Sequence, residues 1–196
     1  MKKILIPILM AGTMISVHAN IFHYAVTLDG PSDGTASPGT GSGTVDYDDG
    51  AHTLAVQVSF TGLVLTGSGT SASHIHAPTA SPFTGTVGIA VPFPTFPLGV
   101  RSGSFSSVID LTQSGSYNGT FFTVNGGGTV AGAEATLAAA MANGEAYWNI
   151  HSSTFPGGEI RGFLTPVPEP SSLALLGVGA VTVAAGAWNK RRARRS

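Results

Sequence analysis

The chain has 196 residues, no cysteine and a net charge of −1, so it can form no disulfide and has no thiol nucleophile. Residues 20–166 contain nine acidic residues but only two basic ones, Arg101 and Arg161, which gives this region a net charge of −7. That charge argues against nucleic acid and anionic lipid as partners, because both are bound by clustered Lys and Arg.

The first 19 residues predict a cleavable signal peptide. Lys2 and Lys3 form a short positive region, an apolar run follows over residues 4–17, and Ala19 ends a small-residue cleavage site. Pro7 disfavours the alternative of a buried helix, and the run is short for a membrane anchor. We therefore expect export through the Sec translocon and a mature chain that begins near Asn20.

Residues 20–166 predict a single all-β domain. Short alternating runs bounded by Gly, Ser, Pro and Asp recur along this region, as they do in β-sandwiches and barrels. Residues 53–60 alternate most clearly, with Val56 on the predicted core face and Gln57 on the solvent face. The predicted strands are residues 22–28, 43–47, 53–60, 74–77, 87–91, 103–111, 117–124, 145–151 and 159–164.

Three segments interrupt this pattern. Residues 31–44 are rich in Gly, Ser, Thr and Pro and predict a flexible loop. Residues 92–99 hold too many prolines for a central strand, so we expect an edge or a loop packed over the core. Residues 131–142 predict one short helix, because Leu137 and Met141 share a face and Asn143-Gly144 supplies a stop.

The histidines of two predicted strands raise the possibility of a metal site. His74 and His76 flank Ile75, so both imidazoles project from one face of their strand, and His151 ends a second strand. If the strands are neighbours, the three imidazoles suit zinc or copper. The alternative is that these histidines are structural hydrogen-bonding residues, in which case no cofactor is expected.

Several blocks around these histidines resemble one known family. They are residues 74–78 (His-Ile-His-Ala-Pro), 115–120 (Gly-Ser-Tyr-Asn-Gly-Thr), 146–151 (Ala-Tyr-Trp-Asn-Ile-His) and 156–162 (Pro-Gly-Gly-Glu-Ile-Arg-Gly). Together they resemble the CHRD domain, named from chordin, over roughly residues 22–164. The resemblance implies an immunoglobulin-like antiparallel sandwich or barrel. It implies little about activity, because the family has no established catalytic role and is usually treated as an extracellular structural or interaction module.

A fainter resemblance links the histidines to copper/zinc superoxide dismutase, a β-sandwich that also carries His-x-His on a strand. It implies copper ligation by His74, His76 and His151, and an anion-guiding role for Arg161. The disulfide cysteines are missing, and no zinc loop or bridging histidine is recognisable. From alternation alone, Glu159 and Arg161 share a face of the last strand, where we expect an exposed ion pair.

The tail, residues 167–196, has three parts in a fixed order. Pro168-Glu169-Pro170 precedes an uncharged stretch over residues 171–189, whose nineteen residues would span roughly 28 Å as a helix, close to a bilayer core of about 30 Å. One interpretation is a simple membrane anchor. A basic cluster then closes the chain: Lys190, Arg191, Arg192, Arg194 and Arg195.

This order resembles the PEP-CTERM sorting signal. The resemblance implies transient anchoring in the inner membrane, cutting by an exosortase, and transfer to the outer surface of a Gram-negative bacterium, usually one that makes exopolysaccharide. We therefore predict a non-enzymatic surface or matrix module that acts by binding or scaffolding, with an exopolysaccharide or an envelope protein as its partner. The alternative function is a zinc or copper protein ligated by histidines.

Overall fold

The computed structural model describes residues 20–64 and 69–168. The predicted signal peptide lies outside these residues, as do Glu169, Pro170, the predicted transmembrane helix and the basic cluster. Within the described part of the chain, no helix is long and apolar enough to cross a membrane.

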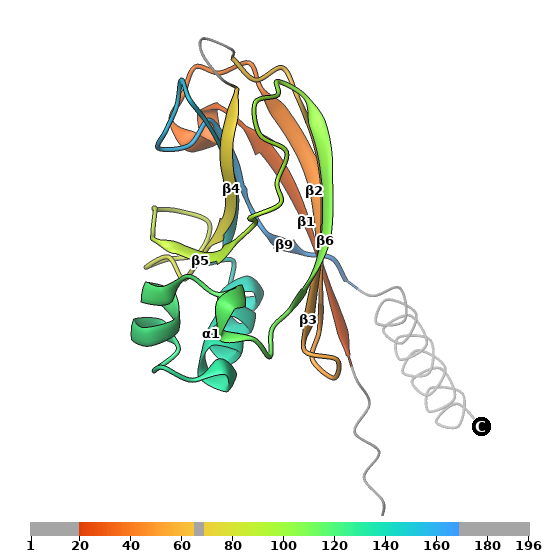
Figure 1. Ribbon diagram of the computed structural model, residues 1–196, viewed down its shortest axis with the longest axis vertical. Helices are drawn as coiled ribbons and strands as arrows, with labels where there is room; N and C mark the ends of the chain where they lie inside the picture. Colours follow the sequence, from red (N-terminus) through yellow and green to blue (C-terminus); the bar gives the residue numbers. More distant parts are fainter. Residues whose placement is uncertain (1–19, 65–68, 169–196) are drawn as a thin grey trace, which may run out of the picture.

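The domain is built on one antiparallel sheet, which confirms the all-β prediction. Its strand order is β5-β4-β7-β8-β1-β2-β3-β6, and β9 pairs with β1. The sheet curls so that β4 and β5 lie across the core from β2, β3 and β6 (Figure 1). The strands are β1 (Ile21–Asp29), β2 (Thr40–Asp48), β3 (Thr53–Thr61), β4 (Thr70–His76), β5 (Ile89–Pro92), β6 (Gly103–Asp110), β7 (Tyr147–Ser152), β8 (Ile160–Phe163) and β9 (Thr165–Pro166).

The core lies inside this curve and follows the alternation of the strands. On β3, Val56 is 2% exposed, whereas Gln57 faces solvent, as predicted. On β7, Trp148 is fully buried and its ring centroid lies 5.0 Å from that of Phe93. Phe93 belongs to the proline-rich segment after β5, and its burial confirms that this segment packs over the core.

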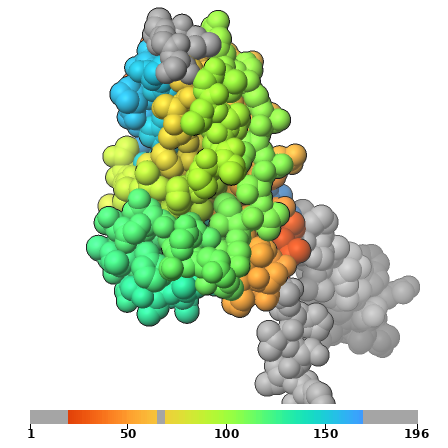
Figure 2. All heavy atoms as spheres, in the orientation of Figure 1, coloured from red at the N-terminus to blue at the C-terminus, as the bar shows by residue number. Residues whose placement is uncertain are grey.

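One α-helix, α1 (Val130–Ala142), closes an end of the sheet (Figures 1 and 2). The predicted helix is confirmed, with its start one residue earlier, where the Thr129 side chain caps it by accepting from the Gly132 N–H. Glu134 attaches the helix to the sheet because its buried carboxylate accepts hydrogen bonds from the Tyr47 hydroxyl and from Nδ1 of His52, both at 2.9 Å.

The strand predicted at residues 117–124 is wrong. The 3₁₀-helix η2 (Ser114–Ser116) precedes this segment, and the π-helix η3 (Phe121–Asn125) begins in it. The Asn118 side chain accepts from the Thr120 N–H and begins a helical turn, which competes with strand pairing. Tyr117 lies in an extended conformation before this turn, and its ring stacks on that of Phe121 with centroids 6.1 Å apart.

The predicted flexible loop at residues 31–44 is also wrong in part. Its first residues form the 3₁₀-helix η1 (Pro31–Asp33), and its last five begin β2. Gly41 and Gly43 lie between β1 and β3, where a side chain on Gly43 would overlap the Gln57 carbonyl. The neighbouring strands supply the apolar area that this glycine-rich segment lacks, so the segment is ordered by its backbone pairing.

Candidate metal centre

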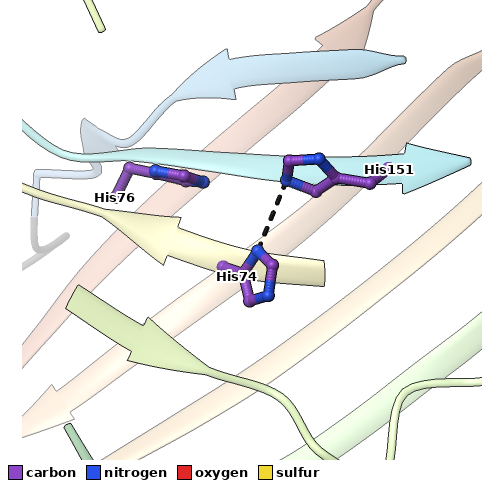
Figure 3. A group of neighbouring side chains, drawn as sticks. All are labelled: His74, His76 and His151. Atoms are coloured by element: carbon purple, nitrogen blue, oxygen red, sulfur yellow. Dashed lines mark hydrogen bonds between the residues drawn. The ribbon is translucent and has the colours of Figure 1, made fainter. Parts of the chain in front are cut away.

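The pairing of β4 with β7 brings the three predicted ligand residues onto one patch of the sheet. His74 pairs with Asn149 and His76 with Tyr147, while His151 lies opposite Ala72. Because side chains alternate across a strand, all three imidazoles project from the face opposite to the buried Ile75 and Trp148. Figure 3 shows His76 and His74 directed toward His151 from the neighbouring strand.

The imidazoles are close enough to share one ion. One ring nitrogen of each residue lies within 4.8 Å of those of the other two, and His74 Nδ1 is 3.3 Å from His151 Nε2. His76 and His151 are only 7% and 9% exposed, and His74 is half-buried. Metal bonds to imidazole are about 2.0–2.1 Å long, so small side-chain movements would place all three nitrogens around a common centre.

Backbone carbonyls determine the tautomers of two of the rings. His76 Nδ1 donates to the Val87 carbonyl at 2.8 Å, and His151 Nδ1 donates to the Pro156 carbonyl at 3.1 Å. A carbonyl can only accept, so the hydrogen is on Nδ1 and each Nε2 has a lone pair, which in His151 accepts a hydrogen bond from His74 Nδ1 (Figure 3). This is the usual outer hydrogen bond of a metal-bound histidine. Nε2 of His76 is buried without a hydrogen-bond partner.

Burial keeps the rings of His74 and His76 neutral. Burial lowers the pKa of His74 to about 4, and the neighbouring His151 and His76 contribute to the shift. Burial also lowers the pKa of His76, although its bond to Val87 opposes the shift. Neutral imidazole is the form that binds a metal, so protons do not compete strongly for these two ligands at neutral pH.

A second layer of side chains holds His76 in place. The Tyr147 ring stacks on the His76 imidazole, with centroids 4.7 Å apart and planes 2° from parallel. The Tyr147 hydroxyl donates to the Val87 carbonyl at 3.3 Å, so the same carbonyl orients both rings. On the β8 side of β7, the Arg161 guanidinium lies 5.0 Å from the centroid of the Tyr147 ring.

Two family models match consecutive parts of the chain. The model of the CHRD domain matches residues 22–164, and that of the PEP-CTERM protein-sorting motif matches residues 166–192. The chain belongs to the CHRD family. The sorting motif implies processing by an exosortase and export to the envelope or surface of a Gram-negative bacterium. No curated protein and no solved structure matches the chain significantly.

The predicted exposed ion pair between Glu159 and Arg161 is wrong. Glu159 is fully buried, and its carboxylate accepts from the Ser37 hydroxyl and the Val64 N–H, both at 2.6 Å. These partners, from the segments before β2 and after β3, take the place of the expected ion pair. Arg161 lies 3.5 Å from Asp33 instead.

Arg161 does not fit the anion-guiding role that the dismutase resemblance implies. Its Nη1 donates to the Gly85 carbonyl at 3.1 Å, and its Nε donates to the Ser32 carbonyl. The same guanidinium offsets part of the increase that burial causes in the pKa of Asp33. These contacts make Arg161 a bridge between two loops and β8, with its charge already partnered.

Sequence reasoning missed the supporting roles of Tyr147, Arg161 and Asp33. The alternation of residues 147–151 contains one usable signal, because it places Tyr147 on the same face as His151. No sequence pattern indicates the contacts of Arg161, since they join β8 to the segments around Ser32 and Gly85, which are far away in the sequence.

Proposed function

We propose that this exported CHRD domain is a non-enzymatic surface module that holds one zinc or copper ion through His74, His76 and His151. The observation that carries the proposal is the convergence of three imidazoles, two of which have their second nitrogen fixed by a backbone carbonyl. Zinc and copper are the common metals for imidazole ligands.

A purely structural role for the histidines explains the cluster less well. Buried polar atoms nearly always have a hydrogen-bond partner, and an orphaned one costs about 1–3 kcal/mol. His76 Nε2 has no such partner, although its ring is 7% exposed and packed against Tyr147. An ion bound by this nitrogen would remove that cost.

Metal titration of the purified protein tests the proposal. We expect one Zn²⁺ or Cu²⁺ per chain and a higher Tm, because an ion that binds only the folded state adds about 2.7 kcal/mol at one hundred times its Kd. His74→Ala and His151→Ala should abolish the gain in Tm. His23→Ala is the matched control, since His23 lies on β1 beside Asp46. Equal gains in His74→Ala and the unaltered protein would refute the site.

The proposed binding or scaffolding role is supported by a second surface, the outer face of β1, β2, β3 and β6. These four strands contain no Lys or Arg. Their register aligns four exposed hydroxyl residues in one row across the sheet: Thr27, Ser42, Ser59 and Ser104. Such a row suits an uncharged exopolysaccharide or a polar envelope protein.

Co-sedimentation with polysaccharide from the host envelope tests this role. Ser59→Arg places a long charged side chain in the middle of the row and should reduce the bound fraction. Ser114→Arg is the control, because Ser114 is exposed in η2, outside this face. Equal binding of the two variants would exclude the row as the contact surface.

A further inference from the structure

The ligand count of the proposed metal site leaves room for a ligand from outside the chain. In residues 20–64 and 69–168, the group of donor residues that could share the ion consists of His74, His76 and His151, with no carboxylate among them. Structural zinc sites usually have four protein ligands, whereas sites with three leave one position for water or another exchangeable ligand.

The charges around the site favour an anion at that position. Three neutral imidazoles leave the charge of a divalent ion uncompensated. Asp33 interacts electrostatically with His151, but it lies 3.5 Å from Arg161, which offsets its charge. A net positive charge in a largely buried layer is costly because few water dipoles can reach it. An anion bound to the metal would reduce this cost.

The exposure of the three rings indicates the side from which a ligand can enter. His76 and His151 are 7% and 9% exposed, whereas His74 is half-buried. His74 lies on β4, the second strand of the sheet, and the edge strand β5 beside it has only four residues. A small ligand can therefore approach past His74, while the other two rings restrict the size of what enters.

We infer that the ion held by His74, His76 and His151 has one exchangeable coordination position and that this position binds a small anion. The inference rests on the proposed metal site and deepens it by naming the class of ligand. The ion itself supplies the attraction, because the donors of Arg161 are engaged by Asp33, Ser32 and Gly85.

Azide titration of the Cu²⁺-loaded protein tests the inference. We expect a saturable azide-to-copper charge-transfer band in the visible spectrum and a matching change in the EPR spectrum. Acetate, as a competitor, tests whether a carboxylate can occupy the same position. Bound copper whose spectra do not change up to about 100 mM azide would overturn the inference, since the ion would then have a closed coordination shell.

Two charge variants add a readout that loose packing alone would not produce. Asp33→Asn leaves Arg161 without its counter-ion and should raise azide affinity about fivefold, whereas Arg161→Gln should lower it by a similar factor. Changes in the same direction in both variants would contradict the electrostatic reasoning. Failure of the unaltered protein to bind Cu²⁺ would refute the metal site itself, an outcome separate from bound copper that ignores azide.

Discussion

The direction of the Val56 side chain is the most direct test of the fold, and Val56→Asp should unfold much of the protein. Val56 is 2% exposed on β3 and lies opposite the fully buried Val45 on β2. Losing its burial costs about 1.5–3 kcal/mol, and an unpaired carboxylate in the same place adds several more. A total of about 4 kcal/mol or more is a large share of a typical stability of about 5–15 kcal/mol.

Circular dichroism melting curves measure this effect. For a domain of this size, a loss of about 4 kcal/mol corresponds to a fall in Tm of roughly 10 °C or more. Gln57→Asp is the matched control, because the adjacent Gln57 is exposed between Thr44 and Ser106 and should change stability by less than about 0.5 kcal/mol. Similar Tm values for the two variants would refute the assigned faces, since a slip of one residue exchanges them.

Three further predictions follow from local contacts and from the tail. Gly162→Ala should destabilise the fold, because the new methyl group would overlap a β1 carbonyl, whereas Gly157→Ala meets open space and should leave Tm unchanged. The hydrogen bond to Glu134 raises the pKa of His52 above 6.5, so the free energy of unfolding should fall as pH rises from 6.5 through that pKa. An equal slope of unfolding free energy against pH in Glu134→Gln would contradict this. Replacing Glu169 should make a longer precursor accumulate, visible on an immunoblot, and unchanged size would exclude exosortase handling.

The sequence alone determined features that depend on neighbouring residues. The alternation of residues 53–60 predicted the two faces of β3 correctly, because successive side chains of a strand must point in opposite directions. The same rule placed His74 and His76 on one face. The stop signal of α1 was also readable, since Asn143 and Gly144 follow its last turn in the chain itself, whereas the Thr129 cap at its start was missed.

The failed predictions come from competition between local and distant partners. Residues 40–42 are too poor in apolar side chains to indicate a strand, yet β1 and β3 on either side pair with them. At residues 117–124 the error runs the other way, because the side chain of Asn118 starts a helical turn that the apolar alternation of the segment conceals.

Only the tertiary structure decided whether the three histidines meet. His74 and His151 are 77 positions apart, and their rings come within 3.3 Å because β4 pairs with β7 in one particular register. Pairing between distant strands depends on how the whole sheet closes over its core, which no local pattern specifies. The same holds for Arg161, whose partner is Asp33 of η1, and for Glu159, whose buried carboxylate accepts from Ser37 and Val64.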